Sequence, residues 1–178
     1  ALQKALRSVE KKGTSFSWSS DGSSLDELMN SIRIPTEFRL QQVQRALYLG
    51  ASLEDVFVAT KIDPWFLSQI EEINQIAREI KISGELTEDA LRRAKSNGFS
   101  DLQLADILDK PVADITATRH RLDSRPVYKT VDTCAAEFEA FTPYHYSSYD
   151  VETEVVPRTK PAIIILGSGP NRIGQGVE

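Results

Sequence analysis

The stretch that decides the fold is residues 63–84, DPWFLSQIEEINQIAREIKISG. Asp63 followed by Pro64 is a strong helix start, because proline at the first helical position lacks only an N–H that would have no partner there. Apolar side chains then recur at helical spacing, at positions 66, 70, 73, 76, 77 and 80. Gly84 ends the pattern. The stretch therefore predicts a long amphipathic helix, the longest of the chain, with one face buried.

Start and stop signals for further helices lie on both sides of this stretch. Ser24 with Glu27, and Ser100 with Gln103, have the spacing of capping boxes, in which each side chain bonds to the other residue's free backbone N–H. Further expected starts are Thr36, Ser52, Thr87 and Pro111, and expected ends are Gly13, Gly50 and Asn97-Gly98. We therefore predict an all-α fold, an orthogonal bundle of about six or seven short helices with an extended tail.

Part of this pattern occurs twice. Gly50-Ala51-Ser52 and Gly98-Phe99-Ser100 each precede a short expected helix, and each short helix is followed by a proline-led one, at Pro64 and Pro111. Two such helix–turn–helix pairs would pack into a compact helical unit. Because DNA-binding proteins also use helix–turn–helix pairs, the pattern raises the alternative of a nucleic-acid-binding or regulatory protein.

Composition and charge argue against that alternative. The 178 residues include 21 Lys and Arg against 26 Asp and Glu, a formal net charge of −5. Nucleic-acid binders usually present a basic face, because phosphate contacts supply most of their non-specific affinity. No apolar run approaches the ~20 residues of a membrane span, and the one cysteine, Cys134, suits a reducing compartment. We expect a cytoplasmic protein with neither a nucleic-acid nor a membrane partner.

The segments outside the expected helices differ in character. Residues 13–24 are rich in Ser, Gly and Thr and predict a surface loop, which Phe16 and Trp18 should pin against a neighbouring surface. After Pro126 we expect a short extended segment, and later an extended connector. Residues 162–166, AIIIL, then predict a buried parallel strand at the end of the tail.

A glycine-rich loop, Gly167-Ser168-Gly169-Pro170, follows that strand. Its glycines permit the close backbone approach that a phosphate-binding loop requires. It departs from the dinucleotide fingerprint, since Arg172 stands where a third glycine belongs, and it lacks the Gly-Lys-Ser/Thr of a P-loop. From the residues alone, a nucleotide-binding loop and a plain strand-to-helix turn both stay open. Because such a turn normally leads into a helix and a second strand, we expect both ends of the chain to be cuts in a longer polypeptide.

Single residues are weaker candidates for chemistry. Cys134 has no general base in a recognisable arrangement near it in the sequence, and a lone cysteine is more often a small buried hydrophobe. His145 stands between two tyrosines, which favours packing or a hydrogen bond over metal ligation. We expect no catalytic, cofactor-binding or metal-binding residue in this chain.

Several stretches resemble the large chain of carbamoyl phosphate synthetase. The most specific is residues 126–138, PVYKTVDTCAAEF, which is similar over thirteen positions. The others are residues 1–7, 63–70, 142–149 and 166–178. The resemblance implies that residues 1–11 end the first, carboxyphosphate synthetase half. Residues 12–160 would be a helical oligomerisation domain, and residues 161–178 would begin the second, carbamoyl phosphate-forming half.

The resemblance also implies a function. The parent would be an ATP-dependent carbon–nitrogen ligase, the glutamine-hydrolysing carbamoyl phosphate synthase of pyrimidine and arginine biosynthesis. It would make carbamoyl phosphate from bicarbonate, glutamine-derived ammonia and two ATP, with Mg or Mn and K as its ions. This chain would be a non-catalytic structural and oligomerisation domain that links the two ATP-grasp halves, with no cofactor of its own.

Partners and site residues follow from the same resemblance. The implied partners are a second copy of the chain, both synthetase halves of the same large chain, and the small glutaminase chain through the parent. The glycine loop would be a turn and the wall of an internal passage for the carbamate intermediate. Arg172, Gly176 and Glu178 are the candidate passage residues, and a larger side chain at Gly176 should obstruct the bore.

Overall fold

Helix α5 (Pro64–Ser83) has 20 residues and is the longest helix in the part of the chain that the structure describes, as its sequence predicts. Asp63 caps it by accepting a hydrogen bond from the Trp65 N–H at 2.8 Å, and Gly84 follows its last residue. The computed structural model describes residues 1–165 apart from 10, 12 and 140–143.

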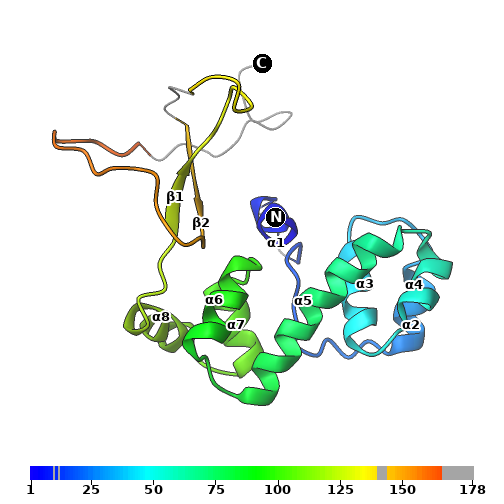
Figure 1. Cartoon of the computed structure of the whole chain (residues 1–178). Coiled ribbons are helices and arrows are strands. Elements are labelled where there is room, and N and C mark those ends of the chain that lie inside the picture. Colours follow the sequence, from blue (N-terminus) through cyan, green and yellow to red (C-terminus); the bar gives the residue numbers. More distant parts are fainter. Residues whose placement is uncertain (10, 12, 140–143, 166–178) are drawn as a thin grey trace.

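Two groups of helices lie at the two ends of α5 (Figure 1). The first group contains α2 (Leu25–Ser31), α3 (Arg39–Tyr48) and α4 (Leu53–Thr60). The second contains α6 (Glu88–Ser96), α7 (Asp101–Leu108) and α8 (Val112–Arg121). A short helix, α1 (Leu2–Ser8), lies between the groups in this view. The described residues thus form eight helices, slightly more than expected, and the predicted helical fold is confirmed.

The expected helix starts are mostly confirmed. Both predicted capping boxes form, at Ser24 and at Ser100. The Ser52 and Thr87 side chains also accept hydrogen bonds from the first turns of α4 and α6. Helix α3 differs, because it begins at Arg39 and Thr36 belongs to the preceding turn, where its carbonyl accepts a hydrogen bond from the Arg39 N–H.

The internal repeat is visible in the backbone. A shift of 48 residues aligns Ser52 with Ser100, and with it α3–α4–α5 aligns with α6–α7–α8. The glycines before the two serines, Gly50 and Gly98, have φ of 105° and 87°, a conformation that favours glycine. The N–H groups that follow them bond back to Ala46 and Ala94 in the two copies, each at 3.0 Å. Aligned positions that are buried in both copies are Val43 and Leu91, Ala46 and Ala94, Val56 and Leu104, and Leu67 and Ile115.

The loop before α2 supplies the centre of the core. Phe16 and Trp18 are 2% and 3% exposed, so the predicted pinning of this loop is confirmed. The Trp18 ring stacks on Phe99, with centroids 5.0 Å apart and planes at 22°. Its indole N–H donates to Oδ1 of buried Asn74 at 3.0 Å, and its carbonyl accepts from Arg45 at 3.2 Å. Trp18 therefore joins α3, α5 and the turn between α6 and α7.

The apolar stripe of α5 begins one residue later than predicted. Phe66 is 57% exposed, while Leu67 is fully buried. Leu67 and Phe66 stand three and four positions before Ile70, and both spacings lie on the same side of a helix. Packing therefore decides which of the two side chains is buried. From Ile70 onward the predicted stripe is buried.

A two-stranded antiparallel sheet follows the helices, with β1 (Val127–Thr130) and β2 (His145–Ser148). Strand β1 confirms the expected extended segment after Pro126, whereas β2 was not expected. The outer edge of β1 is covered by the chain beyond β2, since the Glu154 N–H donates to the Tyr128 carbonyl at 2.8 Å.

The strand expected over residues 162–166 is not found in its described part. Residues 162–165 form no strand, and Ile163, Ile164 and Ile165 are at least 85% exposed. Leu166 lies outside the described residues. A buried parallel strand needs neighbouring strands and cover on both faces, and the described elements place neither beside these isoleucines.

Replacing Trp18 with alanine should lower the free energy of unfolding by about 3–5 kcal/mol. The change removes the ring stacked on Phe99 and one hydrogen bond to buried Asn74. Trp65→Ala is the matched control, because that side chain is 62% exposed and its loss should change stability by less than about 0.5 kcal/mol. Urea unfolding followed by far-UV circular dichroism measures both, and equal effects would contradict a central role for Trp18.

Candidate functional site

The predicted passage residues, Arg172, Gly176 and Glu178, lie outside the described residues, together with the glycine-rich loop. Their role as the wall of a carbamate passage stays a prediction.

The stretch around Cys134 is a backbone turn. The carboxylate of Asp132 accepts hydrogen bonds from the Cys134 N–H at 2.9 Å and the Ala136 N–H at 2.7 Å. It thereby stabilises a turn in which Ala135 and Ala136 have positive φ. His145 Nδ1 lies 3.4 Å from the Thr130 hydroxyl across the two strands, a hydrogen bond as expected. Among the described residues, no three His, Cys, Asp or Glu side chains gather closely enough to hold a metal ion.

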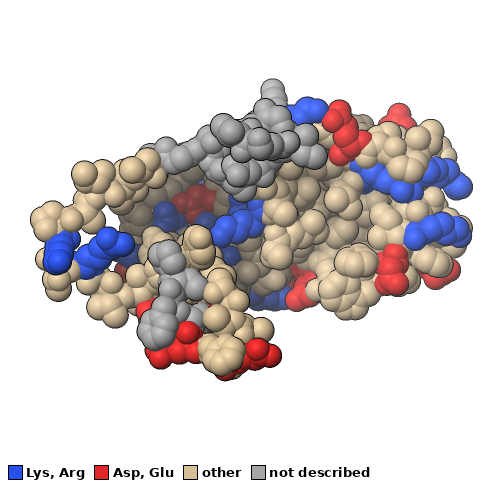
Figure 2. Space-filling view, turned by 90° about the horizontal axis from the view of Figure 1, so that it is seen from above, with Lys and Arg blue, Asp and Glu red and all other residues tan. Residues whose placement is uncertain are grey.

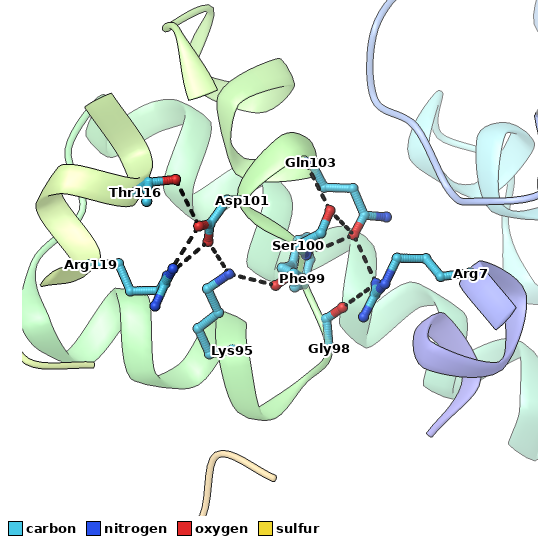
Figure 3. Close-up of polar contacts among 9 residues, drawn as sticks. All are labelled: Arg7, Lys95, Gly98, Phe99, Ser100, Asp101, Gln103, Thr116 and Arg119. Atoms are coloured by element: carbon cyan, nitrogen blue, oxygen red, sulfur yellow. Dashed lines mark hydrogen bonds and ion pairs between the residues drawn. The ribbon is translucent and has the colours of Figure 1, made fainter. Parts of the chain in front are cut away.

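A buried ion cluster joins α6, α7 and α8 (Figure 3). Asp101 forms an ion pair with Lys95 and accepts hydrogen bonds from Arg119 Nε and the Thr116 hydroxyl, each at 3.0 Å. The Lys95 side chain is 4% exposed, and those of Asp101 and Arg119 are 17% exposed. Lys95 also donates to the Phe99 carbonyl at 3.1 Å.

The charges in this cluster depend on one another. Burial alone would raise the pKa of Asp101, but the hydrogen bond and positive charge of Lys95, with the hydrogen bonds from Arg119 and Thr116, outweigh it and hold that pKa below its usual value. Burial lowers the pKa of Lys95, and its bond to Asp101 offsets this only in part. Buried ions stabilise a fold only while each is paired. The carboxylate of Asp101 is therefore committed to holding three helices together.

The helix spacing did not predict this cluster, but the internal repeat contains a signal for it. With the shift of 48, Lys95 aligns with buried Leu47, and Asp101 aligns with Leu53. A charged side chain at a position that is apolar and buried in the other copy needs a partner close by. Lys95 is such an exchange, and Asp101, six residues further along the chain, supplies the partner.

Helix α1 is fastened to the turn between α6 and α7 (Figure 3). Arg7 donates to the Gly98 carbonyl at 2.6 Å. Gln3, which is 2% exposed, donates to the Asn97 carbonyl and accepts from Gln103 Nε2, each at 2.9 Å. These bonds satisfy carbonyls that the end of α6 leaves free. Gly98 suits this close contact, because a Cβ there would lie only 3.2 Å from that of Gln3.

Two lysines connect the β-sheet with the helices. Lys4 Nζ, from α1, donates to the Ser147 carbonyl of β2 at 3.0 Å. The Lys95 ammonium lies 5.8 Å from the centre of the Tyr149 ring, just beyond β2, at a distance typical of a cation–π contact. Strand β2 is thus held near both α1 and α6.

An apolar groove of about 600 Å³ lies between α1 and the first turns of α5, and we call it the α1–α5 groove. Its most exposed large apolar side chains are Trp65 and Phe66, at 62% and 57%. Their rings meet edge to face with centroids 5.0 Å apart. The remaining lining residues are Ala1, Leu2, Gln3, Leu40, Ile62, Gln69, Ile70, Glu72, Ile73, Ser96 and Asn97.

Charges of both signs are intermixed on the surface. Figure 2 shows Lys and Arg side chains next to Asp and Glu along the helical part of this face, without a continuous basic stripe among the residues it describes. A phosphate backbone is bound by clustered basic residues, whereas the charges on this face are of both signs. No helix among the described residues combines the length and apolar character needed to cross a bilayer.

Comparisons with known proteins point to one family. Residues 1–123 match the family described as carbamoyl-phosphate synthetase large chain, oligomerisation domain. The chain is 57% identical over 178 residues to the carbamoyl phosphate synthase large chains of Clavibacter michiganensis subsp. michiganensis and of Streptomyces coelicolor. It is 58% identical over 179 residues to that of Paenarthrobacter aurescens. Each match covers all of this chain and 16% of the relative, so the chain spans about one sixth of the length of these relatives.

Replacing Asp101 with alanine should lower the free energy of unfolding by about 3–5 kcal/mol, because Lys95 and Arg119 would stay buried without their carboxylate. Glu37→Ala is the control, since it breaks an ion pair to Lys11 in which both side chains are more than half exposed. That change should cost less than about 1 kcal/mol. Chemical denaturation of both variants decides the matter, and a small effect of Asp101→Ala would contradict a structural role for the cluster.

The contribution of Asp101 should also depend on pH. Its folded pKa lies below the ordinary value of 3.8, so the unfolded chain takes up the proton first. The stabilisation is then complete above that value and is lost as the pH falls through the folded pKa. The stability difference between the natural chain and Asp101→Asn should shrink as the pH falls below the ordinary value of 3.8 and through the folded pKa. Urea unfolding at several pH values measures it, and a constant difference would be the contrary result.

Proposed function

The chain belongs to the oligomerisation-domain family of the carbamoyl-phosphate synthetase large chain, and from this membership we propose that it is a non-catalytic domain through which a large chain self-associates. The observation that supports this most directly is the family match over residues 1–123, which spans all eight helices that the structure describes.

We propose further that the full-length protein is a cytoplasmic, ATP-dependent carbamoyl phosphate synthase. It would use bicarbonate, two ATP and ammonia from a small glutaminase chain, with Mg or Mn and K. In it, residues 12–160 would separate two synthetase halves, of which the second would begin at residue 161 and contribute Arg172, Gly176 and Glu178 to the passage. Large chains of this name at 54–58% identity support the proposal.

The hydrogen bonds of the buried polar side chains support a non-catalytic domain. Asp101 is engaged by Lys95, Arg119 and Thr116, and the side chain of Asn74 bonds to Trp18 and to the Gln44 carbonyl. These groups hold helices together and do not converge on a cavity. A general acid or base must instead reach a substrate.

The surface of the α2–α4 group supports self-association there. Large apolar side chains are exposed on it or on its turns, at Ile34 (66%), Val58 (52%), Leu49 (39%) and Leu53 (37%). Exposed apolar surface of this kind is typical of protein–protein contacts. The group lies at the far end of α5 from α6–α8 and the β-sheet (Figure 1). A second copy bound there would therefore leave the anchoring of α1 and β2 undisturbed.

A combined Ile34→Glu and Val58→Glu variant of the full-length large chain should self-associate at least about tenfold more weakly, which corresponds to about 1.4 kcal/mol. Charges introduced into an apolar contact would lose water without gaining a partner. Leu102→Glu is the control, because Leu102 is 67% exposed on α7, in the other helix group. Sedimentation velocity over a concentration series measures the association.

Two outcomes would contradict this proposal. Equal weakening by the control would place the contact elsewhere, and unchanged association of every variant would exclude the α2–α4 surface. Bicarbonate-dependent ATP hydrolysis by the purified 178-residue chain would contradict a non-catalytic domain.

A further inference from the structure

We propose that the α1–α5 groove binds an apolar ridge of the synthetase half that precedes the helical domain in the same large chain. The groove would then be a contact within one polypeptide and separate from the self-association surface. This inference rests on the proposed function, since it requires the chain to be part of a longer synthetase.

The groove has the character of a binding surface that lacks its partner. Trp65 and Phe66 are adjacent aromatic residues and both are more than half exposed, and Leu40 beside them is 38% exposed. Aromatic side chains at the rim of a concave apolar surface are typical anchors of protein–protein contacts. In the first turn of α5 they contribute little to the core, because Leu67 fills that role.

The lining residues define the chemistry of the occupant. The one acidic member is Glu72, and the other polar members are neutral, namely Gln3, Gln69, Ser96 and Asn97. No basic side chain lines the groove in the described part of the chain. A phosphate or carboxylate ligand would therefore meet no counter-charge, whereas an apolar ridge with few polar groups would fit.

The shape of the groove disfavours a second copy as the occupant. Two copies usually associate about a two-fold axis, so that the same patch faces itself. A concave surface facing its own copy leaves a void, because neither side supplies the ridge that fills it. The occupant must therefore be convex and different from the groove.

The position of α1 indicates where that convex surface comes from. Leu2 and Gln3 of α1 line the groove, and Gln3 also bonds to Asn97 and Gln103, so the groove continues the contact between α1 and the helical body. Further along α1, Val9 at its C-cap is 44% exposed. Residues 1–11 are proposed to end the first synthetase half. The rest of that half would be tethered beside the groove at a high effective concentration.

A site-specific photo-cross-linker tests this in the full-length large chain. Benzoylphenylalanine is placed at position 66 in the groove, and at position 102 on α7 as the matched control, since both native side chains are well exposed. After irradiation and digestion, mass spectrometry should find position 66 joined to peptides of the same chain that precede residue 1. The yield should be several-fold above that from position 102.

The other outcomes overturn the inference. A cross-linked dimer of two large chains would make the groove a self-association surface. Links to the small chain, or to residues beyond 178, would identify a different occupant. A cross-linking yield at position 66 no higher than at position 102 would show that no segment covers the groove. The mass of the assembly is measured on the same samples, which separates the two proposals. If the large chain is monomeric but position 66 still links to the preceding half, only the proposed self-association is contradicted.

A second variant pair gives an independent measurement. Phe66→Glu in the full-length chain should lower the thermal midpoint of the large chain by several degrees, because a buried carboxylate would face an apolar ridge. Leu102→Glu should leave the midpoint unchanged. Equal midpoints for the two variants would contradict a covered groove.

Discussion

Trp18 lies where three elements meet, and it adds a second connection between the two helix groups, which both pack against α5. Its ring stacks on Phe99 of the second repeat. Its indole N–H donates to Asn74 in α5, and its carbonyl accepts a hydrogen bond from Arg45 in α3, both in the first repeat. A loop of mostly small polar residues thereby becomes part of the core. Without a large side chain with a donor at this point, each repeat would contact its neighbour mainly through α5.

The two repeats share a backbone arrangement but differ in the side chains at one aligned buried position. In the first, Leu47 fills a buried position with apolar volume. In the second, Lys95 occupies the aligned position, pairs with Asp101 and contacts the Tyr149 ring. The second repeat consequently anchors α1 and the β-sheet. One local fold thus supplies an anchoring end in one copy, and in the other copy the end that we propose for self-association.

Local chemistry explains which parts of the fold were predictable. The capping boxes at Ser24 and Ser100 and the length of α5 depend on residues a few positions apart, and they were predicted correctly. The ion cluster, the groove and strand β2 depend on how separate elements pack against one another, so the helical period within each element contained no signal for them. The strand expected over residues 162–166 shows the converse, because apolar composition indicates a strand only where neighbouring strands exist.

The anchoring of α1 also has a consequence for the order of folding. Gln3 and Gln103 are hydrogen-bonded across a separation of 100 residues, and the turn that receives Arg7 forms only when α6 and α7 are in place. At a synthesis rate of about 5–20 residues per second, α1 leaves the ribosome roughly 5–20 s before its partner. Local helices form within microseconds. Docking of α1 on this turn therefore has to wait for α6 and α7, and its bond from Lys4 to Ser147 has to wait for β2.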